Sequence, residues 1–499
     1  MNLSLELMLQ LCIIIPFLAT FAIVASRRYP NLRESITLST SLVLIFLVVT
    51  LYQGLSSGKS ISVYWWELLP GLTISFDIEP LGMLFALVAS FLWLVTTCYS
   101  IGYMRSHQEK NQTRFYVCFA IAIGAVMGLA FSANLFTLFI FYEVLTLSTY
   151  PLVTHAGTEK AKKGGRTYLG ILLTTSIVFF LLAVVSTWLV AGTLDFKPGG
   201  IFADDVDKIT ASIILVLFIF GIGKAAIMPF HRWLPAAMVA PTPVSSLLHA
   251  VAVVKAGVFT VLKVCTFIFG LDLLAQLPST QFLLYLAGFS VLIASLIAMR
   301  QDNLKARLAY STVSQLGYIT IGALLATSSG VIGSAMHIAM HAFGKITLFF
   351  CAGAILVAAH KSKISEMHGL GRQMPFTMAA FFIATLSIIG LPPTGGVWSK
   401  WYLLMGTLET EQFIMMTVLM ISSLLNIAYL LPIPFHAFFP KNSNNNDQFP
   451  DSALTQVKIK EAPLPSLIAI GIATLGCLIL FIYPQALYEL AAAVLEQEK

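Results

Sequence analysis

Residues Phe220–Leu234 read FGIGKAAIMPFHRWL and close a long apolar run that contains a lysine. Lys224 directly follows Gly223 and precedes Pro229 by five residues, so its charge lies beside residues that interrupt a helix. A charged side chain inside a lipid bilayer is costly and is therefore usually functional. The stretch predicts a discontinuous membrane helix near 209–237, with a functional lysine at the break.

A second stretch of the same kind occurs in the other half of the chain. Residues Ile388–Trp401 read IIGLPPTGGVWSKW and place Lys400 beyond a Pro-Pro pair and a Gly-Gly pair. The surrounding apolar segment, 376–407, is too long for one straight crossing, which predicts a second broken helix. Interrupted hydrophobic segments at corresponding places in two halves indicate the working site of a membrane transporter.

The composition is that of a membrane protein. The chain has 499 residues, of which 58% are hydrophobic and only 10% are charged, whereas soluble domains carry about 25% charged residues. The net charge of +6 does not indicate nucleic-acid binding, because the basic residues lie in short loops between apolar segments. The N-terminal segment has no basic region and no cleavage site, so we expect it to be the first span.

The sequence carries no cofactor motif. Its six cysteines are scattered through apolar runs without a C-x-x-C pair, which favours buried small side chains over an iron–sulfur, zinc or disulfide framework. The GIGKA segment around Lys224 lacks the first glycine of a phosphate-binding loop. We therefore predict no cofactor and no resident metal.

Hydropathy predicts an all-α polytopic protein with about fourteen spans. They lie near 3–25, 36–55, 80–103, 115–132, 134–154, 167–192, 209–228, 243–268, 281–299, 307–327, 330–358, 376–407, 411–435 and 465–484. Between spans, Ile61–Glu79 alternates around a Pro-Gly turn, which predicts an external hairpin or interfacial segment. Lys441–Pro463 is polar and rich in Asn, which predicts a cytoplasmic linker. The tail from Gln485 predicts a short amphipathic helix.

The charges of the loops predict the orientation of the chain. Of 29 basic residues, twenty lie in loops that follow odd-numbered spans. Four lie on the opposite side, together with acids such as Asp77, Glu79 and Asp207, and five remain within spans. The positive-inside rule places the basic loops in the cytoplasm and both termini on the outer face.

A small set of ionisable residues is predicted to lie within spans. Its members are Glu143, Lys224, His249, Lys255, Lys263, His337, His341, Lys345 and Lys400. If Glu143 and Lys224 approach each other, each stabilises the other's charged form, and separating them would pass the lysine's proton onward. Moving one charge through 100 mV requires roughly 2.3 kcal/mol, which suits a movable ion pair. The alternative is a static buried pair that joins two helices.

The span near 243–268 carries three of these residues. His249 and Lys255 are six residues apart and hence on different faces of a helix, so a proton could pass between them only through water. Either residue could be the principal relay on this span. Lys263 lies near the outer end, and we expect its amine to reach the lipid headgroups.

His337, His341 and Lys345 recur at i, i+4 and i+8 and so share one helical stripe. Histidine titrates near neutral pH, which suits a proton relay, although hydrogen-bonded packing histidines would give the same pattern. A zinc site is disfavoured, since no third ligand is apparent and Lys345 repels a cation. Lys400 would complete the row, or would neutralise the carbonyl end of the broken helix.

Together these segments resemble the antiporter-like membrane subunits, a family that includes the D-type subunit of Mrp sodium/proton antiporters and the large membrane subunits of respiratory complex I and membrane-bound hydrogenases. The resemblance covers roughly residues 75–435 and rests on FYEVLTL, GKAAIMPFHRWLP, APTPVSSLLHA, DNLKARLAYSTVSQLGY, HIAMHAFGKITLF and GLPPTGGVWSK. It implies fourteen helices with two inverted five-helix repeats. It also implies a proton relay through Glu143, Lys224, His249 or Lys255, His337, His341, Lys345 and Lys400.

The resemblance also implies a division of the chain. Residues 1–110 would hold the first three helices and the hairpin, 111–270 and 271–437 the two repeats, 438–463 a cytoplasmic linker, and 464–499 the last helix and its tail. The Glu143–Lys224 pair would modulate the input side, and Lys400 would mark the exit-side half. Since the chain ends soon after its last span, we expect no lateral helix like that of the largest complex I subunit. Lys400 matches the D-type Mrp subunit, whereas the middle complex I subunit usually has glutamate there.

We therefore expect a proton-translocating subunit of a multi-subunit sodium/proton antiporter, similar to the D-type subunit of Mrp complexes, in a bacterial cytoplasmic membrane. Any sodium path would lie in partner subunits. The alternative is a proton-pumping membrane subunit of a complex I-like NADH:quinone oxidoreductase or a membrane-bound hydrogenase. In that assembly the partner subunits would do the redox chemistry, and this chain would not itself be the catalyst. A relative coupled to inorganic-carbon uptake is a third alternative. A purely structural scaffold would need no row of buried lysines.

Overall fold

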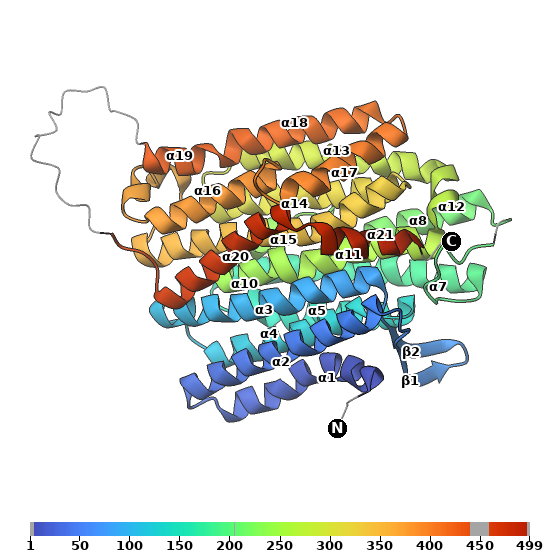
Figure 1. Cartoon of the computed structure of the whole chain (residues 1–499), viewed down its shortest axis with the longest axis horizontal. Helices are drawn as coiled ribbons and strands as arrows, with labels where there is room; N and C mark the ends of the chain where they lie inside the picture. Colours follow the sequence, from blue (N-terminus) through green and yellow to red (C-terminus); the bar gives the residue numbers. More distant parts are fainter. Residues whose placement is uncertain (1–3, 204, 440–458, 497–499) are drawn as a thin grey trace, which may run out of the picture.

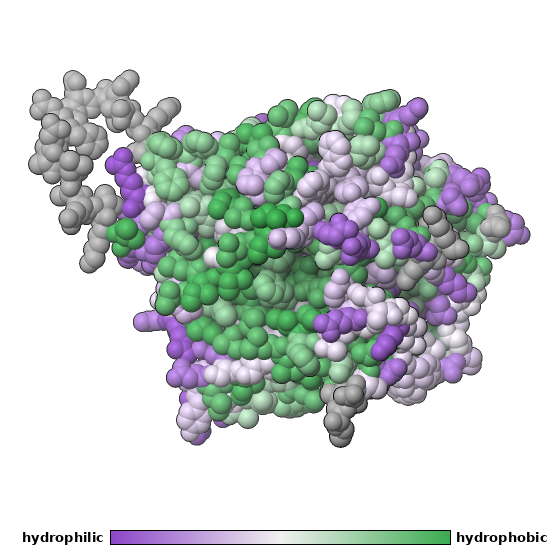
Figure 2. Space-filling model, viewed as in Figure 1, coloured by the Kyte–Doolittle hydropathy of each residue, from purple (hydrophilic) through white to green (hydrophobic). Residues whose placement is uncertain are grey.

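The computed structural model describes residues 4–203, 205–439 and 459–496. In this part of the chain, long helices lie side by side along one common direction, and a two-stranded hairpin lies at one end (Figure 1). Ten of the described helices are long and apolar enough to cross a membrane. Figure 2 shows an apolar band across the middle of the molecule, with hydrophilic residues gathered toward both ends. The prediction of an all-α polytopic membrane protein is confirmed.

Each of the fourteen predicted spans corresponds to one helix or to a pair of consecutive helices. The single helices are α1 (Leu5–Ala25), α2 (Pro30–Ser56), α3 (Pro80–Ser106), α4 (Gln112–Ala130), α5 (Leu135–Val153), α13 (Pro278–Met299), α14 (Leu304–Leu324), α15 (Ser328–Ala359), α18 (Phe413–Leu430) and α20 (Leu464–Ile482). The pairs are α6 (Glu159–Thr174) with α7 (Leu181–Ala191), α8 (Lys208–Gly221) with α9 (Trp233–Ala236), α10 (Thr242–Ser246) with α11 (Val253–Val264), and α16 (Pro375–Ile389) with α17 (Gly396–Glu409). Short helices α12 (Leu271–Gln276), α19 (Pro432–Phe438) and α21 (Gln485–Glu496) lie outside the predicted spans or at their ends.

Polar caps and prolines set where several helices begin. The side chain of Asn134 accepts a hydrogen bond of 2.8 Å from the backbone N–H of Thr137, which caps α5. Asn303 caps α14 in the same way through the N–H of Ala306, at 3.0 Å. Helices α2, α3, α13 and α16 begin with proline, whose missing N–H costs nothing in the first turn.

Both predicted helix breaks are confirmed. Helix α8 ends at Gly221, and the chain continues through one tight turn, η2 (Gly223–Ala225), before α9. The carbonyl oxygen of Gly223 accepts a bond of 2.9 Å from the indole of Trp233, so this part of the break is not left unpaired. Helix α16 ends before Gly390, whose φ of +88° is one that residues with a side chain rarely adopt.

Three short π-helical segments, in which the helical turn is wider than in an α-helix, are not predicted by the sequence. They are η1 (Thr175–Phe180), η4 (Leu247–Val251) and η5 (Cys265–Phe269). Hydropathy predicts one regular span over 243–268, but η4 and η5 flank α11 on either side, so this span is irregular at two places. Such insertions in helices occur frequently at functional sites, and η4 directly precedes the helix that carries Lys255.

The predicted hairpin is also confirmed. Strand β1 (Ser62–Leu69) pairs antiparallel with β2 (Leu72–Asp77), with Ser62 opposite Asp77 and Leu69 opposite Leu72. The amide of Asn134, at the start of α5, donates to the carbonyl oxygen of Thr73 at 3.1 Å and ties the hairpin to the bundle. The predicted linker at 438–463 lies largely outside the described residues, and the boundaries of the repeats remain predictions.

Candidate functional site

Lys224 lies at the first helix break, in η2, and its side chain is fully buried. Its Nζ donates hydrogen bonds to the carbonyl oxygen of Tyr142 at 2.7 Å and to the hydroxyl of Thr146 at 2.6 Å. The same amine lies 3.0 Å from the centroid of the Tyr142 ring, and the face of an aromatic ring attracts a cation. Helix α5 thus provides neutral groups that solvate this lysine inside the bundle. No sequence pattern marks Tyr142 or Thr146 as partners of Lys224, although both lie near Glu143 on the same helix.

Glu143 is not bonded to Lys224 in this structure. Both of its carboxylate oxygens are buried without a hydrogen-bond partner among the described residues, and none of the ion pairs found there includes Glu143. The pair considered in the sequence analysis is therefore separated here. An unpartnered buried carboxylate is costly, and a bound proton or a water molecule removes that cost. Separation is one of the two arrangements that a movable pair requires.

Lys255 on α11 and His341 on α15 are in direct contact. The fully buried Lys255 amine lies 2.5 Å from Nδ1 of His341. The His341 ring in turn stacks on the ring of His337, with centroids 5.7 Å apart. His249, the other candidate on this span, falls in η4, and its side chain lies outside the described part of the structure. Lys255 therefore joins this span to the histidine stripe.

His337 connects the stripe to two neighbouring helices. Its Nδ1 lies 2.8 Å from the hydroxyl of Ser399 on α17, and its Nε2 lies 3.1 Å from the side-chain oxygen of Gln315 on α14. Its ring also stacks on Tyr318 of α14, with centroids 5.8 Å apart. Both ring nitrogens thus have partners, and both partners are neutral groups. These hydrogen bonds fit both interpretations of the sequence pattern, which are packing histidines and a proton relay.

Lys345 is the third member of the stripe on α15 and is fully buried. Its Nζ donates to the hydroxyl of Ser311 at 2.6 Å and to the carbonyl oxygen of Leu308 at 3.3 Å. Both acceptors belong to α14. The stripe therefore makes contacts with several elements: His341 reaches α11, His337 reaches α14 and α17, and Lys345 reaches α14.

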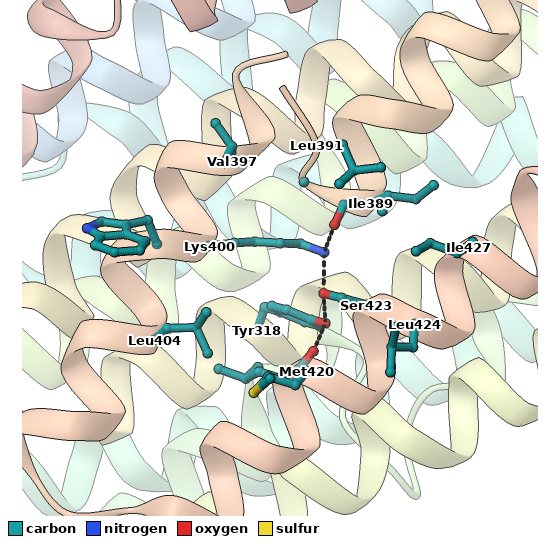
Figure 3. Close-up of a pocket in the computed structure, with 13 residues that line it drawn as sticks. Tyr318, Ile389, Leu391, Val397, Lys400, Leu404, Met420, Ser423, Leu424 and Ile427 are labelled. Carbon is teal, nitrogen blue, oxygen red and sulfur yellow. Dashed lines mark hydrogen bonds between the residues drawn. The ribbon is translucent and has the colours of Figure 1, made fainter. Parts of the chain in front are cut away.

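Lys400 lies just beyond the second helix break, and Figure 3 shows its amine between the end of α16 and the side of α18. Its Nζ donates to the carbonyl oxygen of Ile389 at 2.9 Å and to the hydroxyl of Ser423 at 3.0 Å. Ser423 lies 3.2 Å from the hydroxyl of Tyr318, whose ring centroid is 4.8 Å from the amine. The bond to Ile389 is the one expected of a lysine that neutralises a helix end. The contacts with Tyr318 and Ser423 join Lys400 to the histidine stripe, because the Tyr318 ring also stacks on His337.

A cavity of about 340 Å³ lies beside this lysine. Lys400, Tyr318 and Ser423 line it together with apolar residues of α16, α17 and α18. Because one water molecule occupies about 30 Å³ in the liquid, the cavity has room for several next to the amine. Lys400 thus combines a charge, neutral hydrogen-bond acceptors and space for water.

The expectation that Lys263 reaches the lipid headgroups is wrong. The side chain is fully buried, and its Nζ lies 2.7 Å from Oε1 of Glu79 and 2.8 Å from the carbonyl oxygen of Ser132. Glu79 precedes α3, so the ion pair joins segments that are far apart in the sequence. The sequence does not predict this pair, because the end of a span also suits an amine that reaches the interface, and no local pattern marks Glu79 as the partner.

A second ion pair, between the buried Glu34 and the exposed Arg105, lies near the opposite end of the helices. Glu34 on α2 accepts a hydrogen bond from Arg105 on α3, and its neighbour Arg33 donates to Gln112 at 2.9 Å. Arg33 and Glu34 are 4% and 3% exposed, although the predicted spans 3–25 and 36–55 leave both residues in the loop between them. No cluster of three or more His, Cys, Asp or Glu side chains suited to a metal ion occurs among the described residues.

These contacts form a row of groups that can each gain or lose a proton. From Lys255 to Lys400, the row passes through His341, His337 and Tyr318 by hydrogen bonds or ring contacts. No hydrogen bond among the described residues joins Lys224 to Lys255, so transfer between these two lysines would need water. Chemically, the arrangement suits the movement of protons between buried amines and imidazoles.

Family models and curated proteins match much of the chain. A family model described as "NADH:quinone oxidoreductase/Mrp antiporter, TM" matches residues 132–426, and one described as "NADH-Ubiquinone oxidoreductase (complex I), chain 5 N-terminus" matches residues 69–116. The chain is 32% identical to NADH-quinone oxidoreductase subunit N of Desulforudis audaxviator over 434 residues, which cover 86% of each chain. It is 30% identical to the chloroplastic NAD(P)H-quinone oxidoreductase subunit 5 of Amborella trichopoda over 72% of its own length, and it spans only 50% of that relative.

Two solved structures share the fold over almost the whole chain. One belongs to the Mrp complex of a Dietzia species, with a TM-score of 0.86 and 21% identity, and covers 99% of this chain and 97% of that one. The other belongs to an archaeal membrane-bound sulfane sulfur reductase, with a TM-score of 0.83 and 23% identity, and covers 98% and 97%. At these identities the likeness concerns the fold alone.

Proposed function

The chain belongs to the family of antiporter-like membrane subunits shared by NADH:quinone oxidoreductases and Mrp antiporters, and from that premise we propose that it moves protons along its buried lysine–histidine row. The observation that carries the proposal is the contact between Lys255 and His341, at 2.5 Å. An amine and an imidazole so close compete for one proton between them. That proton can therefore pass between the Lys255 amine and the His341 imidazole without movement of the backbone.

Lys224 and Glu143 supply the first step of the proposed route. Lys224 is held by neutral groups of Tyr142 and Thr146, and Glu143 is unpartnered. Approach of the two would hold a proton on Lys224, and separation would release it toward Lys255 through water. The route then continues through His341 and His337 to Lys400. The ring contacts along this part bring the groups together but carry no proton, so water passes the proton between them.

The last step uses Lys400, the helix break and the cavity beside it. The amine is bound to the end of α16 and to Ser423, and water in the cavity can accept its proton. We assign Lys345 to the row because its amine donates a hydrogen bond to α14. The same helix carries Gln315 and Tyr318, which contact His337.

For the assembly, we propose a multi-subunit sodium/proton antiporter of the Mrp type, in which this chain takes the place of the D-type subunit. The proposed membrane is the bacterial cytoplasmic membrane, with both termini outside. A hard cation requires several oxygen ligands, and the centre of this row offers one carboxylate among several lysines. Any sodium path therefore belongs to, or is shared with, partner subunits.

A second assembly is supported by the curated relatives. The match to the NADH-quinone oxidoreductase protein of Desulforudis audaxviator covers 86% of both chains. In such a complex, redox chemistry in partner subunits would drive the same row, and this chain would remain a component without redox chemistry of its own. The two assemblies share the proton route and differ in what drives it.

The deciding experiment measures cation/proton exchange in everted vesicles from an antiporter-deficient host that carries the whole operon. Lys224→Ala is compared with wild type and with Lys208→Ala, which removes an exposed lysine from the start of the same broken helix. We expect sodium-dependent exchange in wild type and Lys208→Ala, and its loss in Lys224→Ala at equal expression. Acidification driven by NADH or hydrogen, without exchange, would favour the redox assembly. Unchanged exchange in Lys224→Ala would refute the proposed route.

A further inference from the structure

A second cavity, of about 320 Å³, lies beneath the hairpin, at the end of the bundle away from Glu34 and Arg105. Asp77, Glu79, Ser132, Phe196, Lys263 and Phe267 line it. Its charged lining comes from three separate elements, which are the end of β2, the residue before α3 and the last turn of α11. The proton route described above does not use any of these residues.

The ion pair at this cavity is buried but borders on open space. Lys263 is 0% exposed and Glu79 is 7% exposed, and their charged atoms are 2.7 Å apart. The Lys263 amine also lies 4.1 Å from the centroid of the Phe196 ring. A pair that served only to join helices would gain nothing from a cavity beside it, because water weakens the attraction between the two charges.

Two members of the proposed route, Glu143 and Lys255, lie at about the same distance along their helices from the end of the bundle that holds the cavity. Glu143 is eight residues into α5, and Lys255 is eight residues before Lys263 on α11. At 1.5 Å per residue, both lie about 12 Å along their helices from this end of the bundle. At the first turn of α5, the hydroxyl of Thr137 and the side-chain amide of Asn134 both donate hydrogen bonds to the carbonyl oxygen of Thr73 on β2.

Burial favours the protonated form of both carboxyl groups at this cavity. Burial raises the pKa of Glu79, while the charge of Lys263 opposes that rise and the charge of Asp77 adds to it. Burial also raises the pKa of Asp77, again opposed by Lys263. The other charged groups nearby are Asp195 and Lys197, on the segment after α7 that also carries Phe196.

We propose that Asp77, Glu79 and Lys263 form a proton terminal, through which protons pass between solvent at the hairpin end and the buried Glu143 and Lys255. This inference rests on the proposed function and adds a second opening to the route besides Lys400. In the outward direction, the Lys263 ammonium gives its proton to the Glu79 carboxylate, which leaves a neutral amine and a neutral carboxyl. Glu79 releases that proton to water in the cavity, and the amine takes the next proton from the interior through water. The inward direction reverses these steps.

The test compares one carboxylate at each end of the bundle in the assembled complex, because Glu79 and Glu34 are both buried and both bound to a basic side chain. Glu79→Gln removes the terminal's acid, and Glu34→Gln removes the carboxylate that binds Arg105 at the other end. With flux measured per assembled complex, we expect Glu79→Gln to lower proton flux at least tenfold and Glu34→Gln to leave it within twofold of wild type. Glu79→Asp keeps an acid in place and should restore most of the flux. Equal effects of Glu79→Gln and Glu34→Gln would overturn the terminal.

A second variant tests the terminal even if Glu79→Gln does not assemble. Asp77→Asn leaves the Glu79–Lys263 pair intact and removes a negative charge that raises the pKa of Glu79. With pH varied only on the hairpin side, the midpoint of the flux profile should move to lower pH. An unmoved midpoint would overturn the terminal. Loss of flux in Lys224→Ala with normal flux in Glu79→Gln would also overturn it and leave the proposed function standing, whereas normal flux in Lys224→Ala refutes both.

Discussion

At the scale of single residues, the lysines in the middle of the bundle differ from the charged residues at its ends. Lys224, Lys345 and Lys400 donate to carbonyl and hydroxyl oxygens, whereas Lys263 and Arg105 are bound to carboxylates. Neutral acceptors form hydrogen bonds with an ammonium group but bring no negative charge that would favour its protonated form. A carboxylate partner strengthens such a bond, typically to about 1.5–3 kcal/mol. Lys224, Lys345 and Lys400 are therefore held by neutral groups, and the basic residues at the ends of the bundle by charged ones.

The contact between Lys255 and His341 gives a prediction at this scale. His341→Ala removes the imidazole 2.5 Å from the buried amine and opens a gap between Lys255 and His337. We expect proton flux per assembled complex to fall by about tenfold or more. A buried donor left without its partner also costs about 1–3 kcal/mol of stability.

The matched control is His360→Ala, which removes an exposed histidine just after the end of the same helix, α15. Flux and thermal stability should both stay near those of wild type in this control. If His341→Ala and His360→Ala transport protons equally well, the row does not run through His341.

At the scale of elements, the important feature is how closely α11 crosses the first helix break. A Cβ atom built at Gly257 would lie 2.4 Å from the backbone carbon of Lys224 and 2.4 Å from the backbone nitrogen of Ala225. Lys255 is only two residues away on α11. The absence of a side chain at Gly257 thus lets the helix with one lysine pack directly on the turn that carries the other. Their separation in space is set by this contact.

Gly257→Ala should therefore impair transport although it changes no ionisable group. The added methyl group has backbone atoms on its far side, which cannot move aside, so overpacking should cost about 1–3 kcal/mol. We expect proton flux to fall at least fivefold, with a lower thermal midpoint of the purified complex. In Gly170→Ala, the new Cβ meets no atom within 4 Å, and both quantities should stay at their wild-type values. Normal flux in Gly257→Ala would mean that the packing of α11 on the break does not control transfer.

Elements also show which features the sequence could predict. Both breaks were predictable because glycine, proline and lysine stand out in an apolar run, as at Gly390 and Lys400. The stripe of His337, His341 and Lys345 was predictable because helical spacing alone determines it. The groups that hold Lys224 were not, since Tyr142 and Thr146 resemble other residues of apolar helices until α5 is packed against η2. The wider turn η4 has no sequence signal that we recognise.

At the scale of the whole molecule, the loops form two sets at opposite ends of the bundle. Within each set, hydrogen bonds join one loop to another. At one end, Asp302 binds Ser365, and the backbone of Gly369 binds His436. At the other end, the backbone of Phe196 binds Ala133, and that of Lys197 binds Phe267. The first set belongs to the loops rich in lysine and arginine, and the second lies beside the hairpin (Figure 1). Loops assigned to one side by their charges are therefore together in space.

This arrangement makes the orientation of the chain testable with two cysteine variants. Lys59→Cys places an exposed thiol at the hairpin end, and Lys363→Cys places one at the basic end. Five of the six native cysteines are buried and Cys98 is partly buried, so the background should be low. Because basic loops are retained in the cytoplasm, a membrane-impermeant maleimide should label Lys59→Cys in intact cells and Lys363→Cys in everted vesicles. The reverse pattern would show an inverted chain, and the hairpin cavity would then open to the cytoplasm. The lysine–histidine row would be unchanged, but the direction assigned to every step along it would reverse.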